Sequence, residues 1–102
     1  MKTFEQICKQ LINGEFEFTR HALRRAAERN IAEQEIRQAA ESINMIEDYP
    51  EDKYFPSCLV LGYTFNKRPL HIQVSRADTD MVRIITLYEP NPQEWINFCE
   101  RR

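Results

Sequence analysis

The first 43 residues repeat their apolar side chains at the spacing of amphipathic helices, i, i+3, i+4, i+7. Three stripes predict three helices: Phe4, Ile7, Cys8 and Leu11; Ala22, Leu23, Ala26 and Ala27; and Ile36, Ala39, Ala40 and Ile43. Residues 13–14 (Asn-Gly) stop the first helix, and Thr19 is a good N-cap for the second, which we expect to end at Asn30. Between these two helices, Phe16 and Phe18 alternate with glutamates, which predicts a short extended segment.

From residue 44 onward the apolar period changes from helical spacing to two, the period of strands. The clearest alternation places Leu70, Ile72 and Val74 opposite His71, Gln73 and Ser75. We expect strands over Asn44–Tyr49, Cys58–Phe65, Leu70–Ser75 and Val82–Tyr88, separated by proline-bracketed or polar turns. Consecutive strands with such connections predict an antiparallel meander.

The last segment carries the signals of a helix start. Asn91 is a candidate cap, Pro92 suits the first helical position, and Glu94 completes a capping box. Trp95, Phe98 and Cys99 would form its apolar stripe. The order of helices, meander and one C-terminal helix predicts an α+β fold, and 102 residues predict a single domain over residues 1–102.

The composition is that of an ordinary globular protein, with 42% hydrophobic and 29% charged residues. No apolar run approaches the roughly 18 residues of a membrane-spanning helix, and the first residues lack the apolar core of a signal peptide. The three cysteines are odd in number and contain no Cys-x-x-Cys pair. We therefore expect reduced thiols in a cytoplasmic protein, with no membrane association, metal or other cofactor.

The net charge of −2 means that any binding to a polyanion must come from a local patch. The best patch is the second predicted helix, where Arg20, Arg24, Arg25 and Arg29 stand against one acid, Glu28. His21 lies on the side of this helix opposite its alanine stripe, at about 100° per residue. This helix is the first place to look for chemistry.

The two histidines, His21 and His71, both lie off the apolar faces of their predicted elements. The unperturbed pKa of a histidine side chain, about 6.5, suits such a pair to act as general acid and base at neutral pH. Thr86 and Tyr88, in phase on the last strand, would add a hydroxyl donor. With the arginines neutralising a phosphodiester, the set fits metal-independent RNA cleavage by attack of the 2′-hydroxyl.

The same residues also have a purely structural interpretation. A histidine on the polar face of a strand is typically a surface or hydrogen-bonded residue. An arginine row is typically a solvated helix face, here paired with Glu28, Glu33 or Glu35. Spacing and composition alone therefore leave the function open between an enzyme and a binding module.

Several segments, taken together and in order, nonetheless resemble a known family. They are residues 18–22 (Phe-Thr-Arg-His-Ala), 25–31, 35–36, 46–50 (Ile-Glu-Asp-Tyr-Pro), 56–62 (Pro-Ser-Cys-Leu-Val-Leu-Gly), 68–72 (Arg-Pro-Leu-His-Ile) and 84–90 (Ile-Ile-Thr-Leu-Tyr-Glu-Pro), followed by Trp95. This pattern resembles a bacterial domain-of-unknown-function family numbered 4258. That family is similar to the RelE-like toxins within the broader group of barnase, EndoU and colicin-type ribonucleases.

The resemblance implies N-terminal helices packed on a four-stranded antiparallel sheet. It also implies metal-independent endoribonuclease activity as the toxin of a type II toxin–antitoxin system, with RNA as substrate and a cognate antitoxin as partner. The implied catalytic residues are His21, His71 and Tyr88, and RNA phosphate would be bound by Arg24, Arg25, Arg29 and Thr86. The alternative is a non-catalytic RNA- or protein-binding module with a toxin-like fold.

Overall fold

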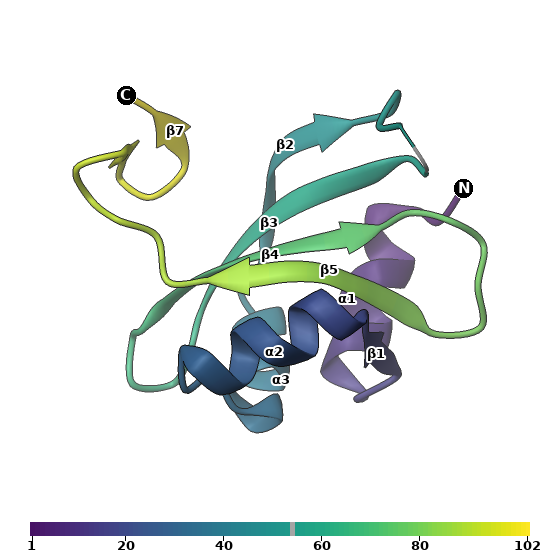
Figure 1. The fold of residues 1–102 in the computed structure, drawn as a ribbon, viewed down its shortest axis with the longest axis horizontal. Helices are drawn as coiled ribbons and strands as arrows, with labels where there is room; N and C mark the ends of the chain where they lie inside the picture. Colours follow the sequence, from purple (N-terminus) through teal and green to yellow (C-terminus); the bar gives the residue numbers. More distant parts are fainter. Residues whose placement is uncertain (54) are drawn as a thin grey trace.

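In the computed structural model, which describes residues 1–53 and 55–102, three helices pack on one face of a five-stranded sheet (Figure 1). The helices are α1 (Phe4–Ile12), α2 (Arg20–Glu28) and α3 (Glu33–Ala40). The sheet contains β1 (Phe16–Phe18), β2 (Asn44–Tyr49), β3 (Ser57–Tyr63), β4 (Pro69–Ser75) and β5 (Val82–Tyr88). A separate hairpin consists of β6 (Trp95–Ile96) and β7 (Glu100–Arg101), and it lies at the upper left in Figure 1, away from α2 and α3 below the sheet.

The sheet differs from the expected four-stranded antiparallel one. Its order is β1-β5-β4-β3-β2, and β2 to β5 form the predicted antiparallel meander. The fifth strand, β1, runs parallel to β5 and pairs Phe16 with Val82 and Phe18 with Ile84. The four-stranded prediction was therefore wrong. Three residues are too few to establish a strand by periodicity, and their partner lies more than sixty residues further along the chain.

The predicted C-terminal helix was also wrong, because residues 91–102, all of which the structure describes, form a turn and a hairpin. The capping signals do start a turn, in which the Asn91 side chain accepts from the Gln93 N–H. The chain then reverses through Asn97 and Phe98, whose φ angles are 51° and 61°. A segment this short gains little from helix formation, whereas the hairpin buries Trp95 against the sheet.

The helix caps follow the sequence closely. The Thr19 hydroxyl accepts from the Ala22 N–H, as its N-cap position predicts. The last residue of α2 is Glu28, and Asn30 follows in the left-handed conformation, with φ 53°, which asparagine tolerates well. Of the helices in the described residues, none is long and apolar enough to cross a membrane.

The hydrophobic core lies between the helices and one face of the sheet. Leu70, Ile72 and Val74 of β4 are fully buried there. On β3, Gly62 permits close approach of α3, since a Cβ atom at this position would lie 2.3 Å from the Ala39 carbonyl oxygen. Because Leu70, Ile72 and Val74 of β4 face the helices, His71 and Gln73 between them point to the other face of the sheet. That second face carries His71, one of the candidate residues.

A bulge in β5 decides which of its residues reach the second face. Val74 pairs with Ile84, but the next pair is Gln73 with Thr86, so Ile85 is the extra residue. After this shift, His71 pairs with Tyr88. The bulge therefore places Thr86 and Tyr88 on the same face as His71 and Gln73.

Candidate active site

His71 is the most enclosed of the predicted site residues, with 0% of its surface exposed. Its Nε2 lies 2.5 Å from the Phe98 carbonyl oxygen, and its Nδ1 lies 3.2 Å from the Tyr88 hydroxyl. The Trp95 ring meets it edge-on at 4.5 Å between centroids. Because a carbonyl only accepts, Nε2 must carry the proton, and in the neutral ring Nδ1 accepts from the Tyr88 O–H. Burial lowers the pKa of His71, which keeps the ring neutral at pH 7.

Tyr88 sits at the centre of the site. It is half-buried, and with Arg29, Arg68, Glu89 and Glu94 it lines a groove of about 600 Å³, called here the Tyr88 groove. Burial raises the pKa of the Tyr88 phenol, so it is a protonated donor at neutral pH. A cation, a phenol and carboxylates thus face one open space.

The C-terminal hairpin is held to the sheet by a second polar cluster next to His71. Arg101 donates to Glu47 of β2 at 2.8 Å, and its guanidinium lies 4.6 Å from the centroid of the Trp95 ring. Glu47 also accepts a hydrogen bond from the Tyr49 hydroxyl. The bond from Arg101 lowers the pKa of Glu47, so the carboxylate stays ionised. The hairpin therefore covers His71 and leaves one side of Tyr88 open.

The two histidines are not brought together. Ala22 and Ala26 turn α2 toward the core face of the sheet, and His21 is exposed on that helix. His71 points to the opposite face and is covered by the hairpin. An acid–base pair acting on one phosphodiester needs both rings accessible at one site, and the structure does not provide this.

The predicted phosphate-binding residues separate into two groups. Arg29 donates to the Leu87 carbonyl at 2.8 Å, which holds it beside Tyr88, and Thr86 lies half-buried on the Tyr88 face. Arg25 instead pairs with Glu28 at 2.7 Å. Arg24 is exposed on α2 and, like Arg25 and His21, does not line the groove.

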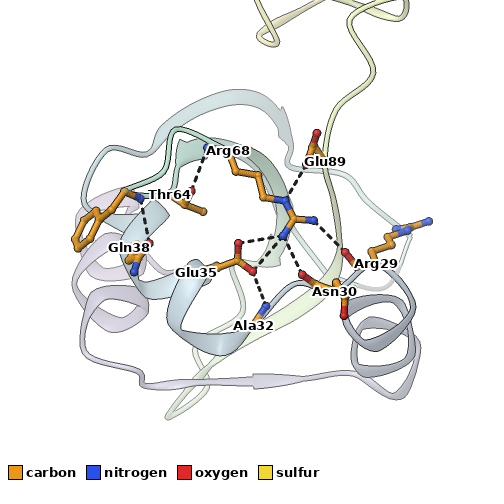
Figure 2. Close-up of polar contacts among 9 residues, drawn as sticks. Arg29, Asn30, Ala32, Glu35, Gln38, Thr64, Arg68 and Glu89 are labelled. Atoms are coloured by element: carbon orange, nitrogen blue, oxygen red, sulfur yellow. Dashed lines mark hydrogen bonds and ion pairs between the residues drawn. The ribbon is translucent and has the colours of Figure 1, made fainter.

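Arg68 is the main residue that the sequence did not single out. Figure 2 shows its guanidinium between α3 and the ends of α2 and β5, bonded to the Glu35 and Glu89 carboxylates and to the carbonyls of Arg29 and Asn30. The hydrogen bond that Arg68 donates to Glu89 raises the pKa of Arg68, and burial opposes this only in part. An arginine in a turn beside a proline gave no signal for this role.

Other missed residues are Glu94 and Arg101, whose places depend on the hairpin that replaced the expected helix. In the part of the chain that the structure describes, no three His, Cys, Asp or Glu side chains gather closely enough to hold a metal ion.

Residues 18–89 match the sequence model of a family described as Domain of unknown function (DUF4258). The chain belongs to this family. No curated protein and no solved structure matches it. The DUF4258 segment runs from the end of β1 to the residue after β5, so it contains His21, Arg29, His71 and Tyr88. It ends before Glu94 and the hairpin, which therefore lie outside the matched part.

Proposed function

We propose that the protein is a metal-independent endoribonuclease that cleaves RNA in the Tyr88 groove. The observation that carries the proposal is the gathering of Arg29, Tyr88 and Glu94 around one groove, with His71 hydrogen-bonded to Tyr88 behind it. These are the groups that a phosphodiester transfer needs: a cation for the phosphate, a proton donor and a carboxylate base.

The groups have complementary tasks in the cleavage. The Arg29 guanidinium binds the non-bridging phosphate oxygens, while the Glu94 carboxylate takes the proton of the 2′-hydroxyl as its oxygen bonds to phosphorus. The bond from phosphorus to the 5′-oxygen breaks, and that oxygen receives the proton of Tyr88. The products are a 2′,3′-cyclic phosphate and a 5′-hydroxyl. In the resting site the Tyr88 O–H donates to His71 Nδ1, and it turns to the 5′-oxygen as that bond breaks. The proton taken up by Glu94 returns to the Tyr88 phenolate through water after the products leave.

The basic side of α2 extends the proposal to RNA outside the groove. Arg20, His21 and Arg24 are exposed along this helix and suit the backbone of a flanking strand. The resemblance to RelE-like toxins supports a cytoplasmic toxin whose activity a cognate antitoxin controls.

The test is cleavage of end-labelled RNA by the purified protein in the presence of EDTA, with analysis of the product ends. We expect 2′,3′-cyclic phosphate ends and a loss of rate of about 10²–10⁴-fold in Tyr88→Phe, the usual cost of losing an acid or base. Tyr63→Phe, an exposed tyrosine on β3, is the matched control and should retain activity. Intact RNA with the wild-type protein, or full activity in Tyr88→Phe, would refute the proposal.

A second candidate is a non-catalytic module that binds RNA or a protein partner. The enclosure of His71, with both ring nitrogens bonded, favours it. This candidate predicts binding without cleavage. Charge reversal at Arg24 and Arg25 should then weaken binding, and Tyr88→Phe should leave it unchanged. Growth arrest and RNA decay on induced expression in a bacterium, both abolished by Tyr88→Phe, would exclude it.

A further inference from the structure

A second hollow, of about 540 Å³, is lined by Tyr49, Pro50, Glu51, Asp52 and Gln73. We call it the Gln73 hollow and propose that it is a nucleobase-binding site selective for adenine, with Gln73 as the specificity-determining residue. The inference rests on the proposed function, because it assumes that the bound polymer is RNA. It adds a substrate preference that the Tyr88 groove does not specify.

A chain of hydrogen bonds fixes the orientation of the Gln73 carboxamide. Ser57 is fully buried, and its hydroxyl donates to an Asp52 carboxylate oxygen at 2.9 Å. The Ser57 oxygen is therefore left to accept, and the group 3.1 Å away must be the Gln73 NH₂ rather than its carbonyl. One N–H of Gln73 is thus used for positioning. Among the described residues, the side-chain carbonyl oxygen and second amide N–H of Gln73 have no hydrogen-bond partner.

Tyr49 also lines the hollow, and its side chain is held in place. The Tyr49 hydroxyl donates to Glu47, and Glu47 is paired with Arg101 of the hairpin. Tyr49 is half-buried and lines the hollow, so its ring is the group there that can stack on a base, an interaction that tolerates any sequence. Tyr49 therefore supplies affinity, and Gln73 supplies the choice of base.

The remaining edge of Gln73 selects the ligand class. An acceptor beside a donor matches adenine, whose amino group donates next to the N7 acceptor; glutamine and adenine are an established bidentate pair. The carboxylates of Glu51 and Asp52 in the same hollow favour a base with a further amino hydrogen. Uracil would instead bring two carbonyl oxygens toward these negative charges, which disfavours it.

Gln73 and Tyr88, which each line one of the two sites, lie on the same face of the sheet. Gln73 pairs directly with Thr86, which lies two residues before Tyr88 on β5. With strands about 4.8 Å apart and about 3.3 Å per residue, the backbones of Gln73 and Tyr88 are roughly 8 Å apart. This separation is compatible with one RNA strand that has a phosphate in the Tyr88 groove and a nearby base in the Gln73 hollow.

The experiment measures binding of short fluorescent 2′-O-methyl oligonucleotides of A, C or U by anisotropy, since a blocked 2′-hydroxyl prevents cleavage. We expect the wild-type protein to bind the A oligomer about tenfold more tightly than the U oligomer, within the range of one bidentate contact. Gln73→Met, which keeps the side-chain length, should abolish this preference. Gln34→Ala, at an exposed glutamine on α3, should retain it.

The outcomes separate the two proposals. Equal affinity of the wild-type protein for A and U, or an unchanged preference in a folded Gln73→Met, would overturn the adenine site. Folding is checked by thermal unfolding, and Tyr49→Leu gives an independent arm that should weaken binding of all the oligomers. A Gln73-dependent preference without cleavage of ordinary RNA would retain the binding site and refute the ribonuclease. Cleavage of RNA without any base preference would retain the ribonuclease and refute the adenine site.

Discussion

Replacing Arg68 by alanine should destabilise the protein more than any other surface arginine replacement that we consider. The Arg68 guanidinium is bonded to Glu35 at 3.0 Å, to Glu89 at 2.8 Å, and to the carbonyls of Asn30 and Arg29 at 2.9 and 3.0 Å. These bonds connect the turn before β4 to residues 29–35 and to Glu89 just after β5 (Figure 2). Their loss would leave the Arg29 and Asn30 carbonyls, which directly follow α2, without this partner.

The size of the effect follows from exposure. The Arg68 and Glu35 side chains are only 25% and 27% exposed, whereas Glu89 is 53% exposed, so the Glu89 pair adds little after solvent screening. Hydrogen bonds to a charged group contribute about 1.5–3 kcal/mol each, and those sharing one guanidinium do not add fully. We therefore expect Arg68→Ala to lower the free energy of unfolding by about 3 kcal/mol. At about 4–8 °C per kcal/mol, Tm would fall by about 12–24 °C.

Urea denaturation and calorimetry measure this change, and the slope with urea verifies that the unfolding reaction stays comparable. Arg68→Lys keeps the charge but not the planar guanidinium, so its free energy of unfolding should fall by about half as much as that of Arg68→Ala. The matched control is Arg83→Ala, because Arg83 pairs with Glu17 at 3.2 Å with both side chains more than 40% exposed; about 0–1 kcal/mol is expected. If Arg68→Ala costs no more than Arg83→Ala, our reasoning about this arginine is wrong.

Three further predictions concern buried positions. Gly62→Ala should cost at least about 1–3 kcal/mol in urea unfolding, since its Cβ would lie 2.3 Å from the Ala39 carbonyl oxygen; a loss below 0.5 kcal/mol, on the order of a surface change, would contradict this. Because burial lowers the pKa of His71 while the unfolded ring titrates near about 6.5, the unfolded state binds more protons below that pH. Stability should therefore fall between pH 7 and pH 5, and this fall should be smaller in His71→Gln; an equal fall in both proteins excludes the explanation. Burial raises the pKa of the Cys58 thiol to about 11, so a thiol reagent at pH 8 should label exposed Cys99 in the folded protein and Cys58 only after unfolding.

Elements with several turns or several alternating pairs could be predicted from the sequence. The helices at Phe4–Ile12, Arg20–Glu28 and Glu33–Ala40 each carry a stripe of three or four apolar residues and a recognisable start or stop. The alternation along Pro69–Ser75 placed His71 on the face away from the core. The helices were predicted because local periodicity reflects burial on one face. The stripe predicted for α2 was half wrong, because Ala22 and Ala26 are buried but Leu23 and Ala27 are exposed.

What could not be predicted depends on contacts between distant segments. The pairing of β1 with β5 has no local signal, and the C-terminal segment follows the packing of Trp95 on His71 rather than its capping residues. The unpredicted hairpin also changes the roles of the candidate site residues. Because the hairpin covers His71, the imidazole ring acts through Tyr88 in our proposal. Glu94, which the sequence suggested only as a helix-capping residue, lines the Tyr88 groove.

The parallel pairing of β1 with β5 also bears on how the chain folds during synthesis. Phe16 pairs with Val82, 66 residues later, so the sheet cannot close at this edge until most of the chain has been made. At roughly 5–20 residues per second, this leaves about 3–13 s between the two strands on a translating ribosome. During that interval the apolar side of Phe16 has no strand to cover it. Slower translation should therefore lengthen the interval in which Phe16 and Phe18 lack their partner strand.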